Sequence, residues 1–289
     1  MIYVLTVFAD LTATTFVQDG GVATSSVLFI GLAIVFGLSI NRFKVPLLWA
    51  SLLFVPLVFV AVWAGQKIPI SADIVPGIIG GDPKKTWSMV LILYCFVAST
   101  TPVWILLQPR DYLSSYLLYA SIFGAFLGIL LGGFSVNYPA FTGWSVPNTG
   151  TLFPILFISV ACGACSGFHS IVASGTSSKQ LNKETDAKVI GYGAMLLEGL
   201  VAVVALATVA MIAKGDPLAG KPPLVIYGTG VSNFLFALGI PKKLGFSFGL
   251  MALSAFVLTT LDTATRLGRY IFEEFFSLKG ARARYLSTP

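Results

Sequence analysis

Residues 152–176 read LFPILFISVACGACSGFHSIVASGT, and this stretch guides the interpretation of the rest of the chain. Its first nine residues are mostly apolar and suited to a bilayer, whereas the remainder is rich in glycine, serine and cysteine and contains the single histidine. Inside lipid, non-helical backbone is tolerated only where protein or a water-filled cavity surrounds it. Transporters use such broken helices to build sites for substrates and ions. The stretch therefore predicts a discontinuous helix near residues 161–176 of a transport protein.

Small and polar residues gather at the predicted break. Gly163 and Gly167 weaken the helix, and Ser166, His169 and Ser170 supply polar side chains. The charge of a histidine changes near neutral pH, so this side chain can respond to protons or contact a substrate. We assign all five residues to a substrate or ion pathway.

The same stretch contains three side chains that could act as metal ligands. Cys162, Cys165 and His169 are three and four residues apart, which would align them on one helical face. A soft metal could accept two thiolates and an imidazole. A fourth ligand is not evident, and a free cysteine often behaves as a small hydrophobic residue. We therefore predict no metal site and no cofactor.

The composition places the chain in a membrane. Of its 289 residues 56% are hydrophobic and only 10% are charged, and the mean hydropathy is +0.88. A soluble domain carries roughly 25% charged residues. The net charge of +6 is scattered over short loops and the tail, which fits cytoplasmic loops and anionic lipid rather than nucleic acid. We predict an all-α integral membrane protein that contacts lipid and binds no nucleic acid.

About eight apolar segments are long enough to span a bilayer, which needs about 20 mainly apolar residues. A shorter segment, Ile226–Ile240, is interpreted as interfacial or re-entrant rather than as a ninth span. Together the spans form a single transmembrane domain over residues 1–289. The predicted spans are Met1–Val17, Val22–Ile40, Pro46–Gly65, Trp87–Leu107, Tyr112–Phe134, Leu152–Ala173, Val189–Ala213 and Leu244–Leu261.

Basic residues indicate the orientation of these spans. Cytoplasmic placement of Asn41–Val45, Gln108–Asp111, Ser177–Lys188 and the chain after Asp262 collects eleven of the eighteen Lys and Arg residues. Cytoplasmic loops of membrane proteins carry such an excess. Residues 266–289 are accordingly predicted to form a basic cytoplasmic tail.

Acidic residues inside spans need a partner or a function, because each costs about 2.5–3.5 kcal/mol on insertion scales. Glu198 lies well inside its span, where it either couples transport to protons or forms a neutral hydrogen bond across a helix interface. Asp262 and Arg266 are four residues apart and can pair on one helical face. That pair is either structural or, with Thr259 and Thr260, part of the substrate pathway.

Arg110 and Asp111 follow a predicted span. As neighbours in the sequence they point in different directions, so each is expected to pair with another element and anchor the loop. Alternatively, Arg110 acts at a gate, because its planar guanidinium matches a substrate carboxylate.

Five segments of the chain resemble the carbon starvation protein A (CstA) family. Residues 102–114 resemble its P-V-W-x-L-L-x-P-R-D-Y-L-S signature, and residues 152–170 resemble its F-P-x-L-F-I-x-x-A-C-G-A-x-S-G-F-H-x stretch. Ser174–Gln180, Gly191–Glu198 and Leu258–Arg266 continue the resemblance in order. Five long matches over most of the chain are more specific than one short motif.

The resemblance implies a multi-spanning carrier of the bacterial inner membrane for peptides, with pyruvate as the substrate of some members and protons as the coupling ion. It also implies an amino acid–polyamine carrier-like fold with inverted repeats. The family's F-H-H and G-A-G-P-x-x-G-P motifs do not occur in this sequence, and family members continue past Arg266. We therefore expect a partial fold, a fragment without the N-terminal helices and the C-terminal end, and possible completion by a second chain.

The combined interpretation is a secondary-active transporter that takes up small peptides or pyruvate-like carboxylates during carbon starvation, coupled to a proton or another cation. The break between Gly163 and His169 belongs to its pathway, and Glu198 serves the coupling. The alternatives are a non-transporting membrane sensor or accessory subunit, and half of a split transporter. An enzyme is not expected, because no nucleophile, base and oxyanion site can be assembled.

Overall fold

The computed structural model describes residues 2–70, 81–141, 143–146, 150–213 and 215–277. Within them the regular secondary structure is helical apart from a short antiparallel pair of strands, β1 (Ser145–Val146) and β2 (Gly150–Thr151). The α-helices are α1 (Ile2–Gln18), α2 (Gly20–Asn41), α3 (Leu47–Lys67), α4 (Pro83–Thr100), α5 (Leu107–Gly132), α6 (Leu152–Cys165), α7 (Gly167–Val172), α8 (Asp186–Ala210), α9 (Pro223–Ala237) and α10 (Lys242–Phe275).

Six helical segments of the described chain are long and apolar enough to cross a membrane. They are α2, α3, α5, the run from Leu152 to Gln180, α8 and α10. α1 and α9 are apolar but shorter, with 17 and 15 residues. The all-α membrane class is thus confirmed. The predicted span Trp87–Leu107 is different in the structure, where α4 ends at Thr100 and α5 begins at Leu107.

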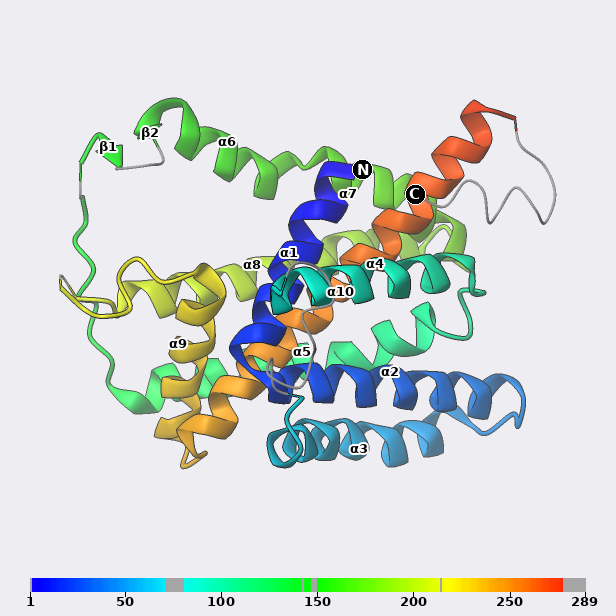
Figure 1. Cartoon of the computed structure of the whole chain (residues 1–289), viewed down its shortest axis with the longest axis horizontal. Coiled ribbons are helices and arrows are strands. Elements are labelled where there is room, and N and C mark those ends of the chain that lie inside the picture. The colour runs from blue at the N-terminus through cyan, green and yellow to red at the C-terminus, as the bar shows by residue number, and fades with distance from the viewer. Residues whose placement is uncertain (1, 71–80, 142, 147–149, 214, 278–289) are drawn as a thin grey trace.

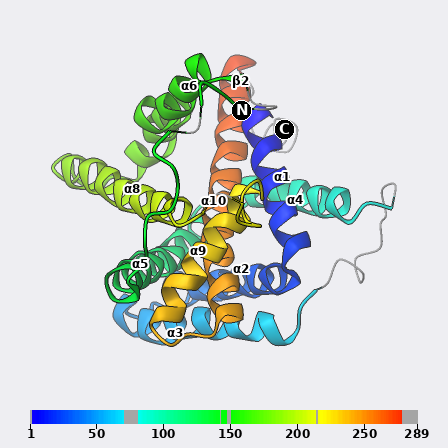
Figure 2. The same cartoon turned by 90° about the vertical axis from the view of Figure 1, so that its left-hand side faces the viewer.

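α10 is the central element of the fold. Its 34 residues correspond to a length of about 51 Å, and it packs against α9, α1, α4, α5 and α2 (Figures 1 and 2). α2 and α3 lie side by side at one end of the molecule, and α6 and α7 lie at the opposite end in both views. α10 therefore connects the two ends of the molecule.

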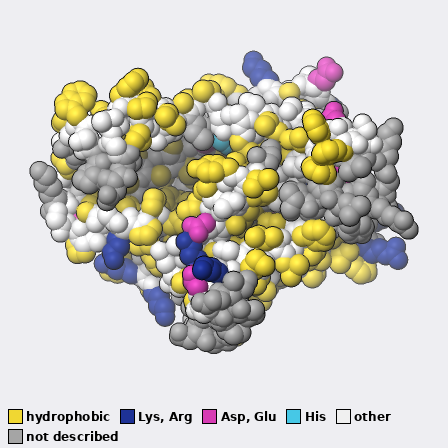
Figure 3. All heavy atoms as spheres, turned by 45° about the horizontal axis from the view of Figure 1, so that its top comes forward, with side chains coloured by type: hydrophobic (Ala, Val, Ile, Leu, Met, Phe, Trp, Pro, Cys, Tyr) yellow, Lys and Arg dark blue, Asp and Glu magenta, His cyan; other side chains and the backbone are white. Residues whose placement is uncertain are grey.

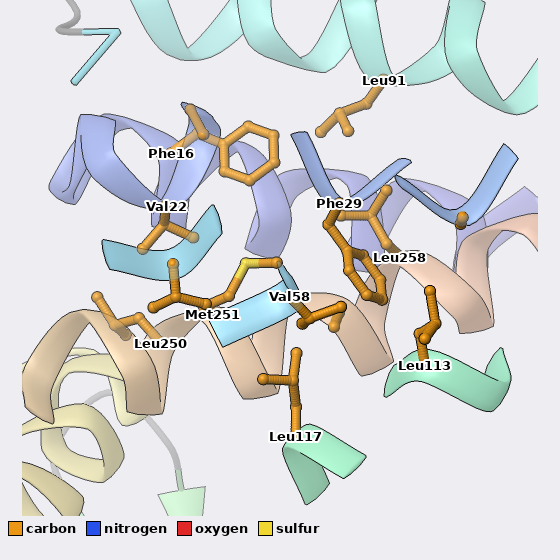
Figure 4. Packing of buried hydrophobic residues seen from close by; sticks show 14 of the residues in the cluster. Phe16, Val22, Phe29, Val58, Leu91, Leu113, Leu117, Leu250, Met251 and Leu258 are labelled. Atoms are coloured by element: carbon orange, nitrogen blue, oxygen red, sulfur yellow. The ribbon is translucent and has the colours of Figure 1, made fainter. Parts of the chain in front are cut away.

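The main hydrophobic core lies where α10 meets α2, α3 and α5. Phe29, Val58, Leu117, Met251 and Leu258 come from these four helices and point toward one another (Figure 4). All five are buried. Apolar side chains at such a junction give van der Waals contacts, which drive helix association where lipid removes the hydrophobic driving force.

α9 occupies the segment expected to be interfacial or re-entrant. It packs against α10, α5 and α8, and Val231 and Phe234 are fully buried there. Burial among three helices favours the re-entrant alternative, because an interfacial helix would expose one side to the bilayer surface.

Close backbone approach between α5 and α9 requires glycine at position 128. A Cβ atom there would lie 2.3 Å from the carbonyl oxygen of Phe234. Gly128→Ala is expected to lower the free energy of unfolding by about 1–3 kcal/mol, as overpacking does in a dense interior. Thermal unfolding in detergent measures the change. Gly199→Ala is the control, because no atom lies within 4 Å of the equivalent position and stability should not fall. Equal stability of both variants would contradict the close approach.

Two predicted loops belong to helices. Residues 108–111 form the first turn of α5 rather than a cytoplasmic loop, and Arg110 is buried. Residues 266–275 of the predicted tail continue α10, where Arg266 and Arg269 are buried, and residues 278–289 lie outside the described part. Three of the eleven basic residues assigned to cytoplasmic segments, Arg110, Arg266 and Arg269, are therefore buried inside the protein. The predicted excess of basic residues in cytoplasmic loops was too high by these three.

Candidate functional site

A buried ion pair joins α5 to α10. Arg110 and Asp262 are each 1% exposed, and the Nη1 atom of Arg110 donates to the Oδ2 atom of Asp262. The hydroxyl of Tyr94 donates to the same oxygen at 2.9 Å, and Nη2 of Arg110 donates to the Oγ1 atom of Thr259 at 2.9 Å. Thr259 and Asp262 are three residues apart on α10, so they share a face. Three helices thus contribute to one polar network.

The expected pairing of Asp262 with Arg266 is wrong. Arg266 donates through Nη2 to the carbonyl oxygens of Ala98 and Thr101, at 2.7 and 2.9 Å. The last carbonyls of a helix have no partner within that helix, so the end of α4 attracts a guanidinium. Arg110 is left to neutralise Asp262.

A cavity of about 360 Å³, lined by both polar and apolar side chains, lies beside this network. It is formed by α5, α8, α10 and the helical turns that follow α7, a π-helical turn (Ala173–Ser177) and a 3₁₀ turn (Ser178–Gln180). Two of its side-chain oxygens, Oδ1 of Asp111 and Oγ1 of Thr176, are buried without a hydrogen-bond partner in the described structure. The residues that line it are Leu107, Asp111, Val172, Thr176, Ser177, Gln180, Leu181, Ile190, Thr259 and Thr263.

The predicted helix break is confirmed, but its residues lie outside this cavity. α6 ends at Cys165, and Ser166 adopts extended backbone angles (φ −61°, ψ 124°) before α7 begins. The Oγ atom of Ser166 accepts a hydrogen bond from the backbone N–H of His169, as an N-cap does. Gly163, Gly167, His169 and Ser170 are exposed in the described chain. The segment reaches the cavity only further on, through Val172 and Thr176.

Glu198 also lies outside the buried network. It is exposed on α8, eight residues beyond Ile190, which places it about 12 Å further along the helix axis. Among the described residues it takes part in no hydrogen bond or ion pair. Thr260 is half-buried and donates to the carbonyl of Phe256, one turn earlier in its own helix. Neither residue lines the cavity.

Several residues of the site were not predicted from the sequence. Tyr94, Gln180 and Arg269 belong to this group. The only sequence feature that could have indicated Tyr94 as a site residue is its hydroxyl group within a mainly apolar segment. Arg269 lies seven residues after Asp262 and therefore on the same helical face, a spacing that could have indicated a buried cation. In the described chain no three His, Cys, Asp or Glu residues gather as a metal site, and the side chain of Cys162 is outside the description.

The face that carries α6 and α7 is largely apolar. Figure 3 shows hydrophobic side chains spread across this side of the molecule. In the most apolar 18-residue part of the run from Leu152 to Gln180 no residue is buried. In the corresponding part of α8, 11% of the residues are buried. Such surfaces face lipid or further protein, because water would not solvate them favourably.

Comparison of the sequence with known proteins gives matches to one family. The family model for carbon starvation protein CstA matches residues 1–229 and 218–287. The chain is 33% identical to the peptide transporter CstA of Bacillus subtilis (strain 168), covering 66% of this chain and 38% of that protein. It is 42% identical to the pyruvate/proton symporter BtsT of Escherichia coli (strain K12), covering 54% of this chain and 24% of that protein.

The chain spans less than two fifths of the length of these relatives. No solved structure matches it. The family model covers nearly every residue, including the segments that contribute Asp111, Thr176 and Asp262 to the site. The chain therefore belongs to the carbon starvation protein CstA family.

Proposed function

We propose that this chain forms part of a carrier that takes up small peptides or pyruvate-like carboxylates across the bacterial inner membrane, coupled to protons. Its relatives are named as peptide transporters and as a pyruvate/proton symporter. The observation that carries the proposal is the Arg110–Asp262 pair buried beside a cavity that contains a further carboxyl group, that of Asp111. Ionisable residues within membrane-spanning helices are costly and mark substrate or ion pathways.

The unpaired polar atoms around the pair support binding rather than a purely structural role. Oδ1 of Asp262 and Nε of Arg110 lack a partner in the described structure, as do the two cavity oxygens of Asp111 and Thr176. Buried polar groups in folded proteins are nearly always paired, so each exception needs an explanation. A substrate or a water chain in the cavity supplies one for Asp111 and Thr176, which line it. The same residues contain no nucleophile and base arrangement, which agrees with transport rather than catalysis.

Uptake by intact cells tests the proposal. Cells that carry the protein at its natural locus are given labelled dialanine, trialanine or pyruvate, with and without a protonophore. We expect uptake of at least one substrate above that of a deletion strain, and its loss when the proton gradient collapses. Uptake equal to that of the deletion strain for all three substrates would contradict a transport function.

Glu198 remains the proposed coupling residue from the sequence. An unpaired carboxyl group on a membrane-spanning helix can exchange protons with a neighbour outside the described chain. Glu198→Gln is expected to remove most of the dependence of uptake on the proton gradient, measured as the ratio of initial rates with and without the protonophore. Glu184→Gln is the matched control, since Glu184 is also exposed but lies in the loop before α8. An unchanged ratio in Glu198→Gln excludes this role.

A second candidate is half of a split transporter. It is favoured by the unburied run from Leu152 to Gln180 together with the exposed Glu198 of α8. Further membrane helices packed on these faces would bury both. Affinity purification from membranes should then recover a second membrane protein in equal amount. A solitary protein without uptake would instead support a sensor or accessory subunit.

A further inference from the structure

The cavity beside the ion pair contains one ionisable side chain. Of its lining residues, only Asp111 carries a charge, and the others are apolar, hydroxyl or amide side chains. Oδ1 of Asp111 is buried without a partner. A buried carboxylate is unfavourable unless a cation or hydrogen-bond donors compensate it.

The three neighbouring arginines donate their hydrogen bonds to groups other than Asp111. Arg110 uses Nη1 for Asp262 and Nη2 for Thr259. Arg266 and Arg269 donate to carbonyl oxygens at the end of α4, and none of the three arginines lines the cavity. Because Arg110 already pairs with Asp262, the carboxyl of Asp111 is compensated only in part, by the nearby charge of Arg110 and by the hydroxyl of Thr259, and its Oδ1 atom has no partner.

The oxygens near Asp111 suit an ammonium group. Thr176 contributes a second buried oxygen without a partner, and Thr259 and Thr263 line the wall formed by α10. A primary ammonium has three N–H donors, which one carboxylate and two hydroxyl oxygens can accept. Gln180 also lines the cavity and accepts a hydrogen bond from Gln108 at 3.3 Å, so the amide N–H₂ of Gln180 can donate to a peptide carbonyl.

We propose that Asp111 binds the N-terminal ammonium group of a short peptide in this cavity. The inference rests on the proposed transport function and specifies its substrate class. The volume of about 360 Å³ is at the lower end of the range for small-molecule sites, about 300–1,000 Å³, which suits a peptide of two or three small residues. Pyruvate has no ammonium group, and its carboxylate would meet the like charge of Asp111.

Competition binding tests the proposal without any mutation. Labelled dialanine is bound to the purified full chain in detergent and displaced by unlabelled dialanine, N-acetyl-dialanine, dialanine amide or pyruvate. N-acetylation removes the positive charge, so it should weaken binding by about 30-fold or more. Dialanine amide keeps the ammonium group and should bind within about threefold of dialanine.

A matched pair of variants assigns the effect to one residue. Asp111→Asn should weaken dialanine binding by about 30-fold or more and leave N-acetyl-dialanine unchanged, so the two ligands become nearly equal. Asp186→Asn, in the first turn of α8 and outside the cavity, should keep the wild-type preference.

Each contrary outcome has a distinct meaning. Equal binding of dialanine and N-acetyl-dialanine to the wild-type chain would overturn the ammonium site while cellular uptake still supports a transporter. Displacement of dialanine by pyruvate as strongly as by dialanine itself would also overturn it. Absence of dialanine binding, with no peptide or pyruvate uptake by cells, would overturn the site and the proposed function together.

Discussion

Arg110→Met is expected to lower the free energy of unfolding by about 3–5 kcal/mol, the cost of leaving one member of a buried ion pair without its partner. Asp262 is 1% exposed, so water cannot replace the lost guanidinium. Tyr94 still donates to Asp262, but a neutral hydroxyl compensates a negative charge only in part. The melting temperature in detergent and the yield of folded protein measure the loss.

The double variant separates the cost of an unpaired charge from the value of the pair. Arg110→Met with Asp262→Leu removes both charges, and stability should recover much of the loss because apolar replacements of a buried pair are often neutral. Arg42→Met is the control for loss of an arginine, because Arg42 is exposed. If Arg110→Met is as stable as Arg42→Met, the ion pair does not hold α5 to α10.

Obstruction of the cavity is the second large effect. Ser177 is an exposed residue of the cavity lining, so a bulky side chain there should enter the cavity without disturbing the core. An overfilled site costs about 1–3 kcal/mol, which corresponds to a loss of affinity of about 5- to 150-fold. Ser177→Trp should therefore reduce both dialanine binding and cellular uptake by a factor in that range, with an unchanged melting temperature.

Ser159→Trp is the matched control for this substitution. Ser159 is exposed on α6 and does not line the cavity. Its variant should bind dialanine as the wild type does. A loss of binding in both variants would indicate a general effect of tryptophan on this side of the protein, and a loss in neither would place the substrate elsewhere.

The helices and the break could be predicted because both depend on local sequence. The length of an apolar run alone indicates whether it can span a bilayer. Gly and Ser after such a run favour an interruption of the helix, and the structure has this interruption at Ser166. The residues 108–111 were harder to place. They are polar and follow an apolar segment, so they resemble a loop, yet they form the first turn of α5 because α10 supplies the partner of Arg110.

The composition of the site could not be predicted because it depends on packing between distant segments. Asp262 and Arg266 have suitable spacing for an ion pair, and only the position of the end of α4 decides that Arg266 points elsewhere. Likewise, Thr176 and Asp111 are 65 residues apart in number, and nothing local indicates that they share a cavity. Three of the segments that meet there were nevertheless recognisable from their resemblance to the CstA family: residues 102–114, Ser174–Gln180 and Leu258–Arg266.

An experimental structure of the purified protein with bound dialanine tests the central claim most directly. The account predicts density for the peptide between α5, α10 and the turns after α7, with its amino group beside Asp111 and close to Thr176. Density for the peptide at another place, with this cavity empty, would contradict the account.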